Sequence, residues 1–193
     1  MTVRAIESAL VISGSPRCGR SQAAAKAKCA ELAARGILAH TFFLSERQVI
    51  ACRGCNHCTR SGACVLLDQN DDWAGLEDLL GASDALFLYA PVYFAGPPAQ
   101  LKALFDRFQV FWARRYCLAD PKEISKVTQK KPAELHILHG NDQHDQHGFD
   151  PLIGICRSAL NIAGFKIEAV IDENMGKSIP PISAPDTPAQ ERS

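Results

Sequence analysis

The chain has 193 residues, of which 47% are apolar and 22% charged, and its 21 basic residues balance 21 acidic ones. This composition suits one globular domain whose core needs no disulfides. A net charge of zero gives no electrostatic reason to expect nucleic acid or a membrane surface as a partner. We see neither a long apolar span nor a signal peptide, so we expect a cytoplasmic protein in which eight cysteines favour metal binding or catalysis over disulfides.

Short apolar runs alternate with helical patterns along the chain, which is typical of an α/β fold with parallel crossovers and a doubly wound sheet. The expected strands cover residues 9–12, 41–44, 85–89, 135–138 and 167–171. The expected helices cover residues 21–35 and 73–80, a long segment from Pro97 to Trp112, and the segment from Asp150 to Gly164.

The end of the chain has a different composition from the rest. Residues 174–193 hold four prolines and few apolar groups, so we expect no packed element there. The sequence therefore divides into a domain at 1–173 and a Pro-rich C-terminal tail at 174–193. This tail is either disordered or an arm that lies over a partner subunit.

A hydroxyl-rich loop follows the first expected strand. It runs from Ser13 to Ser21 and contains three serines, two glycines and two arginines at the start of a helix. Free amides and the helix dipole make that position an anion site. The loop has neither the G-x-G-x-x-G fingerprint nor the Lys-Ser/Thr end of a nucleotide P-loop. One compact cradle suits a single terminal phosphate monoester, as in FMN; the alternative is an ordinary polar turn.

An aromatic loop follows the third expected strand. It contains Pro91, Val92, Tyr93 and Phe94, followed by glycine and proline. In an open α/β sheet, ligands bind beyond the carboxyl ends of the strands at the topological switch point, which strands one and three flank in the order 2-1-3-4-5. The loop is therefore a candidate surface for a planar ring. The alternative is a hydrophobic plug that caps the core.

Two segments, GSPR…S and APVYFAGPPAQLKALFDR, resemble the NADPH-dependent FMN reductase group of flavodoxin-like proteins. The resemblance implies a flavodoxin-like three-layer α/β sandwich with a five-stranded parallel sheet of order 2-1-3-4-5. It also implies three sets of FMN-binding residues, for the phosphate, along the isoalloxazine and closing over the ring. These are Ser13, Ser15, Pro16, Arg17 and Ser21; Pro91, Val92, Tyr93 and Phe94; and Gly140 and Asn141.

Four cysteines, Cys52, Cys55, Cys58 and Cys64, have the spacing C-x2-C-x2-C-x5-C. Such compact thiolate loops are typical of iron–sulfur sites. The segment is similar to that of the iron–sulfur flavoproteins, which implies a [4Fe–4S] cluster that exchanges electrons with FMN in a homodimer or homotetramer. The alternatives are thiols without a cluster, a zinc site, or a dithiol pair.

These features predict an FMN-dependent oxidoreductase or electron-transfer flavoprotein with a [4Fe–4S] cluster. Ferredoxin or NAD(P)H would be the electron donor and a small molecule the acceptor, and no dedicated acid or base is expected because the chemistry is flavin-borne. One alternative is a cluster-free NAD(P)H-dependent FMN or quinone reductase. Another is a non-catalytic, redox-sensing FMN-binding module.

Two further segments stand out. The stretch from His136 to His147 has the spacing H-x2-H-x4-H-x2-H, which we interpret as a solvated polar loop because a strand would point His136 away from its neighbours. Phe111, Trp112 and Tyr116 extend the apolar end of a long helix, and we expect them to mark a subunit interface.

Overall fold

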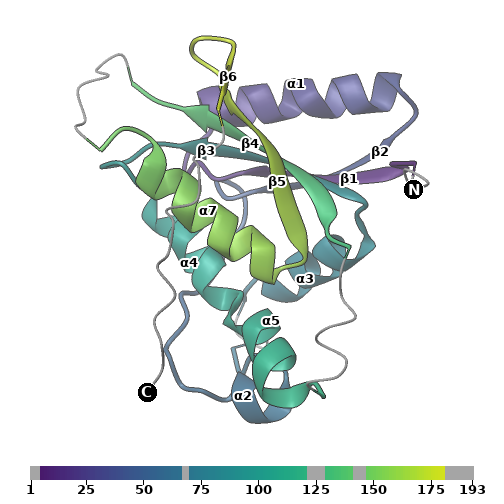
Figure 1. Ribbon diagram of the computed structural model, residues 1–193, viewed down its shortest axis with the longest axis vertical. Coiled ribbons are helices and arrows are strands. Elements are labelled where there is room, and N and C mark those ends of the chain that lie inside the picture. Colours follow the sequence, from purple (N-terminus) through teal and green to yellow (C-terminus); the bar gives the residue numbers. More distant parts are fainter. Residues whose placement is uncertain (1–4, 67–69, 121–128, 141–146, 181–193) are drawn as a thin grey trace, which may run out of the picture.

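The computed structural model describes residues 5–66, 70–120, 129–140 and 147–180 (Figure 1). Strands and helices alternate through most of the chain. The elements are β1 (Ser8–Ser13), α1 (Arg20–Ala34), β2 (Leu38–Phe43), α2 (Cys58–Ser61), α3 (Trp73–Ala82), β3 (Ala85–Pro91), α4 (Ala99–Arg107), α5 (Gln109–Ala113), the π-helix η1 (Arg114–Leu118), β4 (Lys131–Leu138), α7 (Asp150–Ile162), β5 (Phe165–Asp172) and β6 (Lys177–Ile179).

The strands form one sheet of order β2-β1-β3-β4-β5-β6. The first five are parallel to one another, so the predicted flavodoxin-like α/β class is confirmed. The expected count of five strands is wrong, because β6 pairs antiparallel with β5. This strand lies inside the segment 174–193, where no packed element was expected. Its three residues are too few for a hydrophobic alternation to be visible in the sequence.

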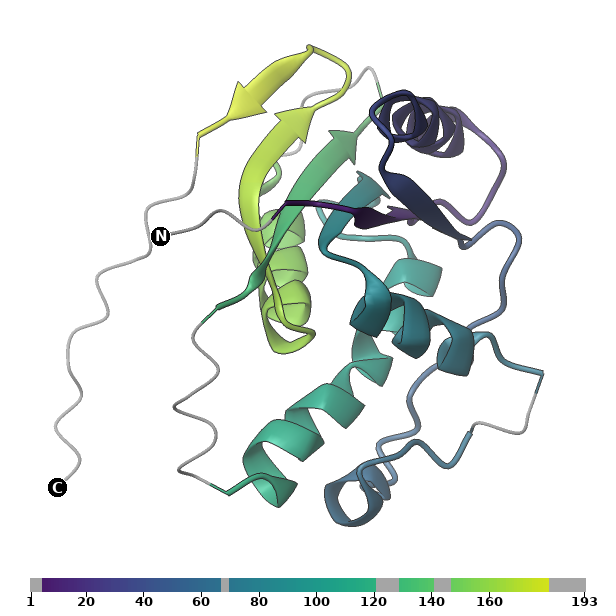
Figure 2. The ribbon, with the colours of Figure 1, turned by 90° about the vertical axis from the view of Figure 1, so that its right-hand side faces the viewer.

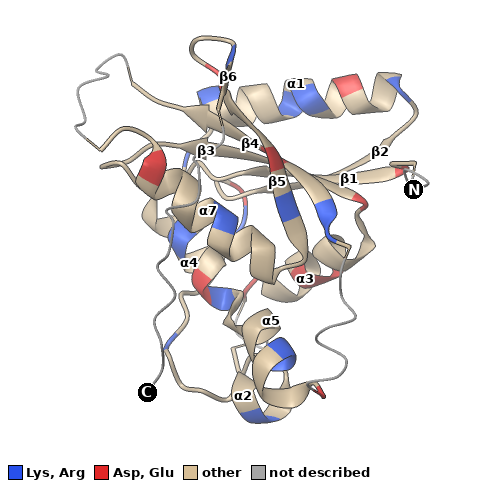
Figure 3. Ribbon diagram, viewed as in Figure 1, with Lys and Arg blue, Asp and Glu red and all other residues tan. Residues whose placement is uncertain are grey.

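Helices cover both faces of the sheet (Figures 1 and 2). Of the described helices, α1 lies on one face, where Ala25 and Leu32 pack against Val11 and Phe87. On the other face α3, α4 and α7 cover the larger core cluster. Buried residues fill most of β1 and β3 because both of their faces are covered. Charges of both signs lie along α1 and α7 (Figure 3).

The long helix expected from Pro97 to Trp112 is divided into α4, α5 and the π-helix η1. Phe111 belongs to the edge of the core, because its ring centroid lies 5.8 Å from that of Trp73. Trp112 leaves the buried stripe and is 40% exposed, and Tyr116 is 50% exposed. Across the described ranges, no helix is both long and apolar enough to span a bilayer.

Candidate functional site at the carboxyl edge of the sheet

The three predicted flavin loops leave the same edge of the sheet. Ser13 at the end of β1 is in register with Tyr89 of β3, and Pro91 at the end of β3 is in register with Leu138 of β4. The chain passes from β1 to β2 on one side, while β3 lies on the other side of β1. This edge is therefore the topological switch point at which open α/β sheets bind ligands.

Ser13 and Gly14 form the start of the first loop. The Ser13 hydroxyl is completely buried and has no hydrogen-bond partner among the described residues. Gly14 donates its amide hydrogen to the carbonyl of Tyr89 at 2.8 Å, and a Cβ at this position would lie 2.5 Å from Cδ2 of Leu101. Position 14 therefore needs glycine, because a side chain would collide with Leu101. The Ser13 hydroxyl remains a buried donor without a partner at the start of the loop.

The rest of the loop leads into α1. Ser15 is buried, and its hydroxyl donates to the carbonyl of Arg17 at 2.9 Å, so it shapes the turn. Ser21 is buried in the first turn of α1, Pro16 is half-buried, and Arg17 is exposed. No side chain caps the start of α1 and its first turn holds no acidic residue, so the helix terminus is suited to an anion.

The aromatic loop contains a tight two-residue turn. The amide of Tyr93 donates to the carbonyl of Gly96 at 2.8 Å, and the reverse bond measures 3.0 Å. Phe94 and Ala95 between them have φ angles of +50° and +60°, which L-residues adopt at a cost. Phe94 is fully exposed and Tyr93 is 38% exposed. A strained turn that holds aromatic rings in solvent at a ligand edge is typical of a binding surface, not of a core plug.

The third loop begins at His139, which several groups hold in place. Its Nε2 lies 3.1 Å from Oδ1 of Asp172, and its carbonyl accepts hydrogen bonds from Asn174 Nδ2 at 2.8 Å and Arg20 Nη1 at 3.4 Å. The bond from Arg20 links the start of α1 to this loop. Gly140 is exposed, whereas Asn141 lies outside the described residues.

His136 lies inside β4, as the sequence predicts, whereas His144 of the same stretch lies outside the described residues. His136 is buried against the face of Tyr89, with ring centroids 4.3 Å apart, and its Nδ1 lies 2.6 Å from Oε1 of Glu173. Burial raises the pKa of Tyr89 well above its ordinary value, and the nearby Glu173 and Glu134 raise it further. The Tyr89 phenol therefore stays neutral near pH 7 and is not suited to act as a base.

The predicted metal ligands lie on a separate segment between β2 and α3. All four are free thiols; Cys52, Cys58 and Cys64 are half-buried and Cys55 is exposed. The amide of Gly54 donates to Sγ of Cys52 at 3.5 Å. Burial raises the pKa of the Cys58 thiol above its ordinary value, and the other three cysteines raise it further.

The donor set fits an iron–sulfur cluster in its chemistry, because four free thiols are the ligands such clusters use. Positive φ angles at Gly54 and Gly62 allow the tight turns of a compact loop. Within the described ranges, however, no three Cys, His, Asp or Glu side chains are grouped closely enough to hold a metal ion. The thiols would have to come closer together to bind a cluster.

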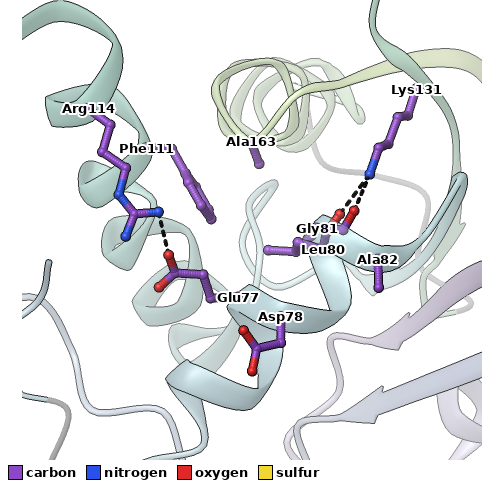
Figure 4. Close-up of a pocket in the computed structure, with 9 residues that line it drawn as sticks. All are labelled: Glu77, Asp78, Leu80, Gly81, Ala82, Phe111, Arg114, Lys131 and Ala163. Atoms are coloured by element: carbon purple, nitrogen blue, oxygen red, sulfur yellow. Dashed lines mark hydrogen bonds and ion pairs between the residues drawn. The ribbon is translucent and has the colours of Figure 1, made fainter. Parts of the chain in front are cut away.

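A cavity of about 420 Å³ lies away from the carboxyl edge, beside the start of β4 (Figure 4). Three of its charged groups have partners: Arg114 pairs with Glu77, and Lys131 donates to the carbonyls of Leu80 and Gly81. The remaining lining residues are Asp78, Ala82, Phe111 and Ala163.

The profile of the NADPH-dependent FMN reductase family matches residues 8–144, which include β1 to β4 and all three loops. The chain belongs to this family. The chain is also similar to an iron–sulfur flavoprotein of Methanosarcina thermophila, to which it is 36% identical over 108 residues, or 55% of each chain. Another, from Methanocaldococcus jannaschii, is 35% identical over 97 residues, or 50% of this chain and 49% of that one. The predicted resemblance is thereby confirmed, although this chain spans only about half the length of the curated relatives it matches.

Solved structures agree with the fold of the family. The NAD(P)H:quinone oxidoreductase of Methanothermobacter marburgensis superposes with a TM-score of 0.56 at 17% identity, covering 87% of each chain. An azoreductase of Bacillus anthracis gives a TM-score of 0.55 at 13% identity, covering 86% of this chain and 87% of that one. At such identities the likeness concerns the fold alone.

The sequence did not single out Arg107, which the structure buries completely beside the cysteine segment. A signal was present: Arg107 lies three residues after Leu104 and four before Phe111, so helical spacing places it beside the apolar stripe. A charge at such a position needs a buried partner.

Proposed function

We propose that this chain is an FMN-dependent oxidoreductase with its flavin at the carboxyl edge of β1, β3 and β4 and a [4Fe–4S] cluster on the Cys52–Cys64 loop. The observation that carries the flavin proposal is the buried, unpartnered hydroxyl of Ser13 beside the start of α1. A buried donor without a partner is costly, and a phosphate oxygen would relieve that cost.

The chain's own residues would bind and orient the flavin. Ser13, Ser21 and the free amides of α1 would donate to the phosphate, Arg17 would add positive charge from the surface, and Ser15 and Pro16 would shape the turn. Pro91 to Phe94 would lie along the ring and exclude water from it, and Gly140 and Asn141 would close over it. When bound, FMN supplies both hydride acceptance and one-electron transfer.

The cluster proposal rests on the four free thiols and on the iron–sulfur flavoproteins among the relatives. Cys52, Cys55, Cys58 and Cys64 would each provide one thiolate to the cluster. Electrons would enter from ferredoxin or NAD(P)H and leave to a small-molecule acceptor. The loop would place a one-electron centre within the same fold as the flavin.

A cluster-free NAD(P)H-dependent FMN or quinone reductase is the second candidate. The observation that favours it is the absence, within the described residues, of a group of side chains close enough to hold a metal ion. In this case NAD(P)H would reduce the flavin directly, and changing Cys52 would leave turnover with a quinone unaltered.

We also propose that the protein is a homodimer or homotetramer. Trp112, Tyr116 and Leu118 on α5 and η1 are 40%, 50% and 46% exposed, and such neighbouring apolar groups are typical of interfaces. Light scattering at micromolar concentration tests this proposal, and a monomer would contradict it.

Two measurements separate these functions. The first compares the binding of FMN and riboflavin to flavin-free protein, because riboflavin lacks the phosphate; equal affinity would contradict the phosphate cradle. The second determines iron and acid-labile sulfide in anaerobically purified protein, where we expect about four of each per chain. Flavin with neither iron nor sulfide favours the cluster-free reductase. Flavin binding without NAD(P)H oxidation or ferredoxin-linked reduction favours the non-catalytic module.

A further inference from the structure

The four predicted cluster ligands lie on one segment between β2 and α3, described at residues 51–66 and 70, which we call the excursion. Its outgoing limb follows Ile50, and its returning limb leads to Asp71. The chain returns beside the point at which it leaves. The amide of Gln48 donates to Oδ2 of Asp72 at 2.8 Å, and the amide of Asp72 donates back to the carbonyl of Gln48 at 2.8 Å. The excursion therefore has a closed stem that keeps its two limbs together.

Arg107 of α4 holds both limbs at once. Its Nη1 donates to the carbonyl of Ile50 at 2.9 Å and also to Oδ2 of Asp71. Ile50 lies just before the outgoing limb, which leads to Cys52, and Asp71 lies just after the returning limb. The side chains of Arg107 and Asp71 are both 0% exposed, so the pair is shielded from water and from salt.

The position of the guanidinium is itself fixed. Its Cζ lies 5.0 Å from the centre of the Trp73 ring, and Trp73 is completely buried. Trp73 also packs against Phe108, the residue after Arg107, with ring centroids 5.9 Å apart. The guanidinium lies over this ring, and both of its bonds to the limbs come from Nη1; Nε and Nη2 have no hydrogen-bond partner among the described residues.

The helices that follow Arg107 contact the thiol loop further from the stem. The Cys58 thiol lies 3.9 Å from the carbonyl of Gln109, and Nε of Arg114 donates to the carbonyl of Gly62 at 2.6 Å. The successive helices α4, α5 and η1 thus contact the excursion near its ends, through Arg107, and near its middle, at Cys58 and Gly62. Of these contacts, those of Arg107 are the ones that join both limbs.

We propose that Arg107 is a positioning residue for the cysteine loop: by holding Ile50 and Asp71 together, it fixes the separation of the two limbs that lead to and from the four thiols. The expected effect of this positioning is that the protein retains its cluster, and in this respect the inference rests on the proposed function. It assigns Arg107 no contact with the iron or with the flavin.

The test compares Arg107→Gln and Asp71→Asn with Lys102→Gln. Lys102 is a matched control because it forms an exposed ion pair with Asp106 at 2.6 Å on the same helix and does not touch the excursion. We expect both stem variants to hold at least fivefold less iron and sulfide per bound FMN, with FMN affinity within twofold of the wild type. The cluster that remains should give an altered EPR spectrum when reduced. Lys102→Gln should match the wild type in every respect.

A second readout needs no cluster. Tryptic cleavage after Arg53 and Arg60 in iron-free protein reports how firmly the excursion is held. We expect it to become at least tenfold faster in the stem variants and to stay unchanged in Lys102→Gln. If the wild type holds no iron, the cluster proposal fails while this cleavage assay still decides the role of Arg107; cleavage at the wild-type rate would overturn it.

A double variant protects the test against simple misfolding. Replacing both partners of a buried ion pair with apolar residues is far better tolerated than removing one. Arg107→Met with Asp71→Leu should therefore fold and bind FMN, yet show the same loss of cluster and the same fast cleavage. Full cluster content and slow cleavage in this variant would contradict the proposal.

Discussion

The amide of Gly14 donates to the carbonyl of Tyr89 at 2.8 Å and ties the end of β1 to the end of β3. This bond continues the parallel pairing of the two strands one residue into the loop. The hydroxyl-rich loop and the aromatic loop are thereby held on either side of one edge. This junction positions the two loops of the predicted binding site.

Ser13→Ala removes a buried hydroxyl that has no partner within the described residues. Because such an unsatisfied group is costly, we expect its removal to raise the stability of the flavin-free protein by about 1–3 kcal/mol. The dissociation constant for FMN should rise about tenfold, or ~1.4 kcal/mol. Fluorescence titration and urea denaturation measure the two effects.

Ser83→Ala is the matched control, because Ser83 is equally buried but its hydroxyl donates to the carbonyl of Leu79 at 2.8 Å. This variant should lose about 1 kcal/mol of stability and bind FMN normally. If the Ser13 variant behaved like the Ser83 variant, the Ser13 hydroxyl would have a structural role only.

Gly14→Ala places a methyl group against Leu101, which is itself fully buried. Repacking of this contact should cost about 1–3 kcal/mol of unfolding free energy. Gly19→Ala in the same loop meets nothing within 4 Å and should be nearly neutral. Chemical denaturation of both variants checks the difference, and equal stabilities would argue against the close approach of β1 and Leu101.

Variants of Phe94 and Ala95 distinguish the effect of backbone strain on stability from the effect of ring contact on FMN binding. Ala95→Gly should raise stability by about 0.5–1 kcal/mol, because glycine adopts positive φ without a Cβ clash. It should leave FMN affinity within twofold. Phe94→Asn tolerates the same backbone but removes the ring, so FMN should bind several-fold more weakly and become more accessible to iodide quenching. Unchanged quenching would show that Phe94 does not shield the flavin.

Cys156 is completely buried, and burial raises the pKa of its thiol far above the ordinary value. Its thiolate form is therefore scarce near pH 8, and it should react with iodoacetamide on the order of 100-fold more slowly than exposed Cys18. Peptide mass spectrometry of the native protein measures both rates. Similar rates would mean that α7 opens readily from the core.

The sequence was sufficient to predict the alternation of strands and helices and the three loops. It could not predict which serine would lack a partner, because Ser15 is engaged by the backbone of Arg17 while Ser13 faces no acceptor. The positive φ angles of Phe94 and Ala95 depend on the bridge between Tyr93 and Gly96. Neither residue type signals such a turn on its own.

The missed features are those that depend on tertiary contact. Strand β6 is too short for a pattern and exists because β5 offers it an edge. In the sequence, Arg107 is a single charge at the end of an apolar helix. Its role depends on Ile50 and Asp71, which only the fold brings beside it. The cysteine spacing, by contrast, is visible in the sequence, but the separation of the thiols depends on how the limbs of the excursion are held.

The most direct test of the two-centre account is the absorption spectrum of anaerobically purified protein beside that of Cys58→Ser, with FMN, iron and sulfide determined in each. Both proteins should show resolved flavin bands. The wild type should add a broad absorption that the variant lacks, together with about four iron and four sulfide per chain. A wild-type spectrum that shows flavin alone, with neither iron nor sulfide, would contradict the cluster; a spectrum without flavin would contradict the site at the ends of β1 and β3.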